Sequence, residues 1–176
     1  WLTENCKRFG TLPFAGVARA AFIAVQFLKS FVETSIFSEE EYDLFLNSIS
    51  TVSKELNTDL YKLASNEIEK NYFLEKYGHL RPGTYDILSL RYDENFEGYF
   101  NLSTIINKKD DDFIFSQQKI NLINKELKEN GLKINAENLI IFIKEAIQAR
   151  EYVKFIFTKS LSKILDLIKN YVKDLI

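Results

Sequence analysis

Sulfur-containing residues are nearly absent from this chain of 176 residues, which has one cysteine, Cys6, and no methionine. A single cysteine excludes an internal disulfide, which is compatible with a reducing cytoplasm. Together with the single histidine, it also supplies too few ligands for a zinc site. We therefore expect a cytoplasmic protein that binds no metal ion itself.

The chain also lacks the features of secretion and membrane insertion. Its first residues, WLTENCKRFG, contain no basic region followed by an apolar run, so no signal peptide is indicated. No apolar run reaches the length that a bilayer requires, and we expect no membrane partner. Without methionine and with Trp1 first, the sequence fits a processed small protein or, as we favour, a piece of a longer polypeptide.

Neither sign of charge is in excess. The formal net charge is −2 at pH 7, with 46% hydrophobic and 27% charged residues. This balance gives no electrostatic reason to expect nucleic acid as a partner. Because the length suits one domain with a substantial core, we predict a single helical domain over residues 1–176.

Glycine and proline, which interrupt helices, are scarce, with six glycines and two prolines. Apolar residues recur at helical spacing, which predicts an all-α irregular helical bundle with little or no sheet. The expected helices begin at Thr11, at a capping box from Ser38 to Glu41, at Asn57 or Thr58, at Ser65 and at Ser116. Their expected ends lie near Thr34, Leu56, Leu63, Gly78 and Gly131.

The longest expected helix covers residues 135–176, which contain no glycine or proline. Unbroken, it would extend roughly 60 Å at about 1.5 Å per residue. Its apolar positions drift around the helix axis, which indicates burial against several partners or a kink near 158–160. We expect its end to project or to dock on a neighbouring copy, which leaves open a homo-oligomer through this C-terminal helix.

One central stretch, residues 76–94 with the sequence KYGHLRPGTYDILSLRYDE, differs from the helical patterns around it. Pro82 has no amide hydrogen and moves Arg81 out of the α region, while Gly78 and Gly83 permit positive φ. The stretch therefore predicts an ordered, non-helical loop held by the surrounding helices. Loops in such a frame often carry binding groups.

Six polar residues in or near this loop are candidates for binding a substrate: His79, Arg81, Tyr85, Asp86, Arg91 and Arg19. Arginine suits carboxylates and phosphates, and this chain uses it sparingly, with eighteen lysines against five arginines. A structural interpretation stays open for each: ion pairs for the arginines, core packing for the tyrosine, a loop-fixing hydrogen bond for the histidine. We expect the loop to pack on the first helix near Arg19, and at least one loop arginine to pair with a carboxylate such as Asp86, Asp93 or Glu94.

Motifs for self-contained catalysis are missing. The scattered glycines form no phosphate-binding loop, and no serine lies in a nucleophile elbow. The run KKDDD at residues 108–112 has no chelating spacing, so we interpret it as a solvated turn. The chain by itself is expected to be inactive.

Three stretches nevertheless suggest a family. They are GHLRPGTYDILSLRYDE at residues 78–94, RFGTLPFAGVARAAFIA at 8–24 and AREYVKFIFTKSLSKIL at 149–165, and they contain all five arginines. The stretch at residues 78–94 resembles the phosphotransferases related to phosphoenolpyruvate synthase (pyruvate, water dikinase), especially the branch with rifampin phosphotransferase. The resemblance lies in the order of its motifs, which are Gly-His, Arg-Pro-Gly, Tyr-Asp and Arg-Tyr-Asp-Glu. Leu90 stands where that pattern has proline, which puts the local turn in doubt.

The resemblance implies a helical middle domain on the acceptor side of an ATP-dependent small-molecule phosphotransferase. In that family an ATP-grasp domain, which would hold ATP and Mg²⁺, phosphorylates a histidine on a swivelling domain that carries the phosphoryl group to the acceptor. His79 is not expected to be that histidine, which lies in a separate domain with a different motif. The implied partners are the ATP-grasp and phosphohistidine domains and a small-molecule acceptor. The alternative is a non-enzymatic α-helical interaction or scaffold domain.

Overall fold

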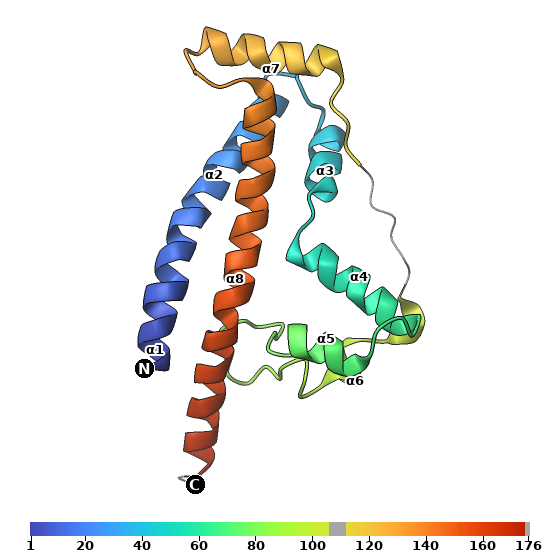
Figure 1. The fold of residues 1–176 in the computed structure, drawn as a ribbon, viewed down its shortest axis with the longest axis vertical. Coiled ribbons are helices and arrows are strands. Elements are labelled where there is room, and N and C mark those ends of the chain that lie inside the picture. Colours follow the sequence, from blue (N-terminus) through green and yellow to red (C-terminus); the bar gives the residue numbers. More distant parts are fainter. Residues whose placement is uncertain (106–111, 175–176) are drawn as a thin grey trace. The chain divides into compact units, whose positions relative to one another are not determined.

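The protein is all-α, as predicted. The computed structural model describes residues 1–105 and 112–174, and no β-strand occurs among them (Figure 1). The helices are α1 (Leu2–Asn5), a π-helix (Cys6–Thr11), α2 (Leu12–Glu33), α3 (Glu39–Ser48), α4 (Val52–Ala64), α5 (Lys70–Tyr77), α6 (Phe96–Tyr99), a 3-10 helix (Leu102–Thr104), α7 (Gln117–Glu129) and α8 (Ala136–Lys173). The run KKDDD, apart from Asp112, lies outside the described residues.

The chain divides into two compact units. The first unit comprises Trp1–Phe14, Val52–Lys108 and Tyr152–Ile176, and the second comprises Ala15–Thr51 and Lys109–Glu151. Both α2 and α8 contribute residues to each unit. The central loop and the last part of α8 therefore belong to the first unit, whereas most of α2 belongs to the second.

Phenylalanine rings form the centre of the second unit. The ring of Phe37 contacts those of Phe31, Phe45, Phe113 and Phe115, with centroid distances of 5.3 to 6.0 Å. Such pairs each contribute about 0.5–1.5 kcal/mol beyond the area that they bury. The remaining core is aliphatic and comes from α2, α7 and α8: Ala24, Leu28, Ile123, Leu127, Leu139, Ile140 and Ile143.

The first unit has a smaller core built on α4 and α5. Phe73 and Tyr77 of α5 are fully buried, and their rings lie 4.9 Å apart. The buried carboxylate of Asp59 in α4 accepts hydrogen bonds from the Tyr77 hydroxyl at 2.9 Å and from Lys76 Nζ at 2.8 Å. Because a buried charge needs such partners, these contacts fix α5, and with it the start of the central loop, against α4.

Several helix ends follow the local signals in the sequence. The capping box is present: Ser38 Oγ accepts from Glu41 N at 3.2 Å, and Glu41 Oε2 accepts from Ser38 N at 2.9 Å. Ser116 caps α7 by accepting from the amide of Lys119. Gly131 takes a positive φ of 70° just after α7, as a stop signal requires. These predictions are confirmed.

The helix that begins after Ser38 is shorter than predicted and ends at Ser48, not near Leu56. The Ser48 hydroxyl donates to the Phe45 carbonyl at 2.7 Å, which competes with continued helix. Ile49 then takes an extended conformation that buries its side chain. The core therefore gains an isoleucine at the position where the helical pattern alone predicted continuity.

The next two predicted starts are also wrong. Asn57 and Thr58 lie inside α4, where the Thr58 hydroxyl donates to the carbonyl one turn earlier at 3.1 Å. Ser65 is not the cap of α5, because it belongs to the turn that follows α4. In this turn Asn66 takes a positive φ of 58°. Glu69 is the residue that precedes α5.

The N-terminal helical segment is continuous from Leu2 to Glu33 through the π-helix, so it starts before Thr11. By length and composition alone this segment is long and apolar enough to cross a bilayer. This corrects the expectation that no segment reaches the length that a bilayer requires. Only 22% of its most apolar stretch is buried, yet core helices of soluble proteins pass the same test. Arg19 lies within it, and a charge at the centre of a span costs about 2.5–3.5 kcal/mol in insertion experiments.

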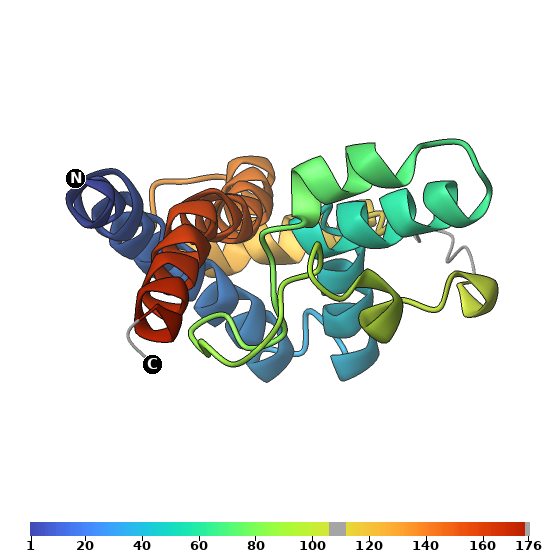
Figure 2. The same cartoon turned by 90° about the horizontal axis from the view of Figure 1, so that it is seen from below.

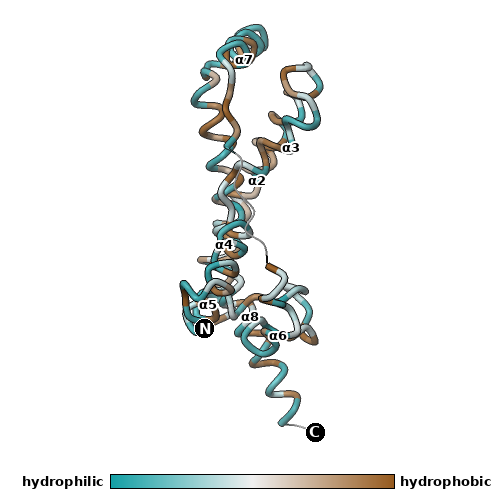
Figure 3. The backbone as a smooth tube through the Cα atoms, turned by 90° about the vertical axis from the view of Figure 1, so that its right-hand side faces the viewer, coloured by the Kyte–Doolittle hydropathy of each residue, from teal (hydrophilic) through white to brown (hydrophobic). Residues whose placement is uncertain are grey.

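The long C-terminal helix is confirmed. Asn135 Oδ1 accepts from Asn138 N at 2.9 Å, and α8 then runs for 38 residues without a break (Figures 1 and 2). At about 1.5 Å per residue this is roughly 57 Å. Toward the C-terminal end, polar and apolar residues alternate in short stretches (Figure 3).

Two glycines of the N-terminal segment allow a matched test of helix packing. A Cβ added to Gly10 would lie 2.8 Å from Phe157 Cβ, whereas one added to Gly16 would have no atom within 4 Å. We expect Gly10→Ala to lower the free energy of unfolding by about 1–3 kcal/mol. Gly16→Ala should raise it by about 0.5–1 kcal/mol, because alanine favours the helix. Urea denaturation measures both, and a similar loss for the two variants would contradict this packing.

Candidate functional site

The central loop follows α5 and closes on itself through its backbone. Tyr92 N donates to Leu80 O at 2.8 Å, and Asp93 N donates to Gly78 O at 3.2 Å. Gly78 ends α5, as predicted, but has an ordinary α backbone with φ −56° and does not use the positive φ that glycine permits. A Cβ on Gly78 would collide with Leu74 O at the end of α5 and would lie 3.0 Å from Asp93 Cβ, so the glycine serves both the helix end and the close approach of the two loop arms.

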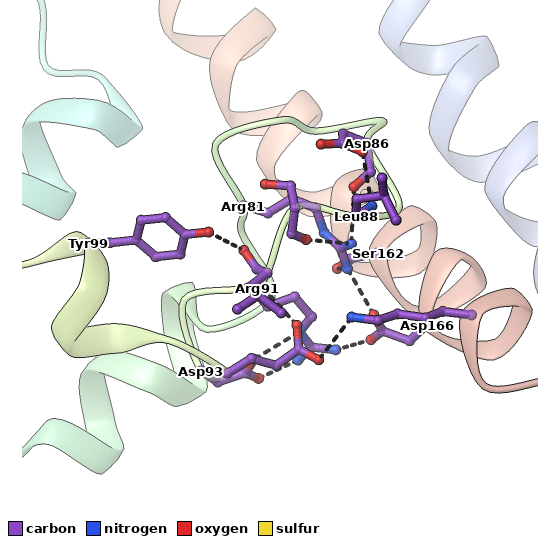
Figure 4. A network of polar contacts seen from close by, with 12 residues as sticks. Arg81, Asp86, Leu88, Arg91, Asp93, Tyr99, Ser162 and Asp166 are labelled. Atoms are coloured by element: carbon purple, nitrogen blue, oxygen red, sulfur yellow. Dashed lines mark hydrogen bonds and ion pairs between the residues drawn. The ribbon is translucent and has the colours of Figure 1, made fainter. Parts of the chain in front are cut away.

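One carboxylate of α8, that of Asp166, holds both arms of this loop (Figure 4). Its Oδ1 accepts from Arg81 Nη2 at 2.9 Å, and its Oδ2 accepts from Arg91 Nη1. Arg91 also donates through Nε to Asp93 Oδ1 at 2.9 Å and through Nη2 to the second oxygen of that residue. The predicted pairing of a loop arginine with a carboxylate is confirmed. Of its two partners, Asp93 was foreseen and Asp166 was not.

Arg81 is the most buried charged residue of the loop, with 6% of its surface exposed. Its Nη2 also donates to Ser162 Oγ at 2.9 Å, and its Nη1 donates to the carbonyls of Ser89 at 3.1 Å and Asp86 at 3.4 Å. Its Nε has no hydrogen-bond partner in the described part of the chain. A buried guanidinium needs most of its donors satisfied, and here both terminal nitrogens are.

The residues that sequence analysis missed lie on one face of α8. Thr158, Ser162 and Asp166 follow one another at four-residue spacing, which brings helix side chains to the same side. Thr158 and Ser162 are buried, and the Thr158 hydroxyl donates to Phe155 O at 2.8 Å. Their signal was the recurrence of uncharged or acidic polar residues at four-residue spacing in a helix whose other polar residues here are mostly lysines. This pattern indicates a polar face of α8 but does not identify the segment that packs on it.

The tip of the loop is fixed by short-range hydrogen bonds. Asp86 N donates to Gly83 O at 2.9 Å, and Asp86 Oδ1 accepts from Leu88 N at 2.9 Å. The Asp86 carboxylate thus shapes the turn and does not pair with an arginine. The side chains of Tyr85 and Leu88 do not belong to the core, because 68% and 82% of their respective surfaces are exposed.

His79 lies at the base of the loop beside α8. Its Nε2 is 3.3 Å from Phe155 O, and its ring centroid is 5.0 Å from that of Phe155. Burial lowers the pKa of His79 to about 4, and the charges of Lys159 and Arg91 act in the same direction, against hydrogen bonds to backbone carbonyls. The imidazole is therefore neutral at pH 7. With so low a pKa it suits hydrogen bonding better than proton abstraction.

Charge is balanced at the contact with α8. Burial alone would raise the pKa of Asp166, but hydrogen bonds from Arg91 and Arg81 outweigh it and hold the pKa below its ordinary value. Glu94 Oε2 accepts from Arg91 N at 2.8 Å, and Lys169 lies 3.9 Å from Glu94. The arginine donors are engaged by the chain's own acceptors, so an external anion would have to displace a carboxylate to reach them.

The candidate residues thus divide into three groups. His79, Arg81, Asp86 and Arg91 are brought together at the loop and α8, and Tyr85 is exposed at the tip. Arg19 is exposed on α2 in the second unit, and the loop makes its polar contacts with α8. The expectation that the loop packs near Arg19 joins residues of the two different units and stays a prediction. No group of three or more metal-ligating side chains occurs within residues 1–105 and 112–174.

The first prediction from this site concerns Asp166→Asn. It leaves the buried Arg81 and the Arg91 guanidinium without their shared carboxylate, and removal of one partner from a buried pair costs about 3–5 kcal/mol. Because Asp166 is 15% exposed, we expect a loss near 3 kcal/mol in the free energy of unfolding, measured with urea. Glu97→Gln removes the exposed ion pair with Lys70, which solvent screens, and should have a much smaller effect. Equal costs would show that the contact does not hold the loop.

The second prediction concerns pH. The unfolded His79 has a pKa of 6.5 and the folded one a pKa of about 4, so the unfolded state binds more protons between these values. Stability should therefore be full above pH 6.5 and fall as the pH drops toward 4. His79 is the only histidine, so His79→Gln should flatten the dependence of the free energy of unfolding between about pH 6.5 and 5, above the carboxylate range. An unchanged slope would contradict the burial of a neutral imidazole.

Comparison with protein-family models, with curated proteins and with solved structures finds no match to this chain. The resemblance of its three stretches to phosphoenolpyruvate synthase-like phosphotransferases therefore rests on those residues alone.

Proposed function

We propose that this chain is the helical, acceptor-side middle domain of a multidomain ATP-dependent phosphotransferase similar to phosphoenolpyruvate synthase. The observation that supports the proposal is the position of the family-like residues in the fold. Parts of all three family-like stretches, far apart in the sequence, meet in the first unit on the same few turns of α8.

The contacts are specific. From the stretch at residues 8–24, Gly10 approaches Phe157 so closely that a Cβ on Gly10 would lie 2.8 Å from Phe157 Cβ. The ring of Phe14 lies 5.3 Å from that of Phe157. From the central stretch, His79 contacts Phe155 and Arg81 donates to Ser162. A shared ancestral site would explain why the family-like residues gather here, whereas unrelated similarities have no reason to be in contact.

Within this proposal the loop residues have different roles. Arg81 and Arg91 hold the loop to α8, because their donors are already bound to carboxylates and carbonyls. The exposed Tyr85 and the half-buried, neutral His79 are the groups left to contact an acceptor. ATP and Mg²⁺ belong to the ATP-grasp domain of the parent protein, and the phosphohistidine belongs to its swivelling domain. A cytoplasmic location is part of the same proposal.

A second candidate, an α-helical scaffold or interaction domain, is favoured by one observation. The loop arginines are neutralised by Asp166 and Asp93, as in a purely structural strap. Under this alternative the loop braces α8, and no acceptor contacts it. The two candidates differ in what happens when His79 is replaced.

In the multidomain parent, His79→Gln should leave formation of the phosphohistidine from ATP intact and slow transfer to the acceptor by about tenfold, as expected for a lost or misplaced hydrogen bond. The reason is that His79 lies on the acceptor side and is not the carrier. The two half-reactions are measured separately, with radiolabelled ATP and with the isolated phosphorylated enzyme. Tyr99→Phe, which removes only a 3.0 Å bond to Leu90 O, serves as the matched loop control.

Equal effects of His79→Gln on both half-reactions, or none on transfer, would favour the scaffold interpretation. The isolated chain provides a further check, since it should neither hydrolyse ATP nor become phosphorylated. Acid-labile phosphate on His79 after incubation with ATP and Mg²⁺ would contradict the assignment of the carrier histidine to another domain.

A further inference from the structure

Two arginines of the second unit differ from those of the central loop. Arg19 on α2 and Arg150 on α8 are exposed, and neither forms an ion pair within the part of the chain that the structure describes. Arg150 Cζ lies 5.0 Å from the centroid of the Phe22 ring. Arg19 precedes Phe22 by three residues, a spacing that places the two side chains on the same side of α2.

The surface around these arginines is apolar and open. Phe22 is 61% exposed and Ile23 is 54% exposed. Gly16, one turn earlier, has no atom within 4 Å of the place where a Cβ would lie. A glycine inside a helix is destabilising relative to alanine, and no contact within the described chain requires it here. We call Gly16, Arg19, Phe22, Ile23 and Arg150 the α2 patch.

A complementary surface lies on α3 of the same unit. Glu39, Glu40 and Asp43 are exposed, and Leu44 beside them is 45% exposed. Glu39 and Glu40 are in the first helical turn, where carboxylates are locally favourable. Asp43 lies beyond that turn and has no ion-pair partner among residues 1–105 and 112–174. We call these four residues the α3 patch.

We propose that a second copy of this chain covers the α2 patch, with the α3 patch of one copy contacting the α2 patch of another. The two surfaces carry opposite charges next to exposed apolar side chains, which is the complementarity that selects partners. The two patches are also of similar length, since Glu39 to Leu44 spans about 8 Å and Gly16 to Ile23 about 11 Å at about 1.5 Å per residue. Because each chain carries both patches, a two-fold pair makes the contact twice. This inference goes beyond the proposed function and does not depend on it.

The test is the oligomeric state of the chain itself, measured by sedimentation velocity over a concentration series at low and high salt. Wild-type protein should associate at low salt and dissociate as salt rises. Arg19→Glu and Asp43→Arg should each raise the dissociation constant at least about tenfold, because each places like charges opposite one another. The two changes combined in one chain restore opposite charges and should restore association. Arg150→Glu is an independent variant of the same patch.

Lys128→Glu on α7 is the matched control, since it makes the same change of charge at an exposed position of the same unit. It should leave association unchanged, and circular dichroism verifies that every variant keeps its helices. A monomer at all concentrations, equal effects of Arg19→Glu and Lys128→Glu, or no rescue in the combined variant would each overturn the proposal. Dissociation by Tyr171→Glu but not by Arg19→Glu would overturn it too and assign association to the C-terminal end of α8. None of these outcomes bears on phosphoryl transfer.

Discussion

The carboxylate of Asp166 is the contact on which the geometry of the central loop depends. One oxygen binds Arg81 on the first arm of the loop and the other binds Arg91 on the second. With Asp93 included, two positive and two negative charges cancel, so a buried guanidinium is tolerated without a net charge in the interior. The backbone bonds between the arms, and the close approach at Gly78, follow from this common anchor.

Because of this anchor, the residues that fix the loop differ from the residues that are free to contact a ligand. The arginines, which composition singled out as recognition residues, are committed to the chain's own acceptors. What the fixed loop presents outward is a tyrosine and a leucine at its tip, with a neutral imidazole at its base. Recognition by Tyr85 and His79 would then rely on hydrogen bonding and apolar contact more than on charge. A rigid frame lowers the entropy lost when such groups bind a ligand.

Sequence reasoning succeeded where a signal is local. The capping box at Ser38, the glycine stop at Gly131 and the long helix after Asn135 each depend on residues within a turn or two of one another. It failed where a residue adopts a conformation against its usual preference. Asn66 takes a φ of 58°, a role normally signalled by glycine, in the turn after α4, and α5 begins after Glu69 and not at Ser65.

Long-range pairing was the other limit. That a loop arginine needs a carboxylate followed from burial alone, but the choice of Asp166 depends on how the chain folds between two residues that are 85 positions apart. The packing of the loop near Arg19 is a long-range prediction of the same kind, since it joins residues of the two different units. Spacing along α8 reveals a polar face, and only packing reveals its partner.

That spacing makes the length of α8 as important as its composition. Phe155, Ser162 and Asp166 meet the loop because they lie in phase along the helix. One residue inserted between them would turn Asp166 by about 100° around the axis, away from both arginines, although every side chain remained present. Natural variants of this protein should therefore accept many substitutions on the outer face of α8 but very few insertions or deletions between positions 155 and 166.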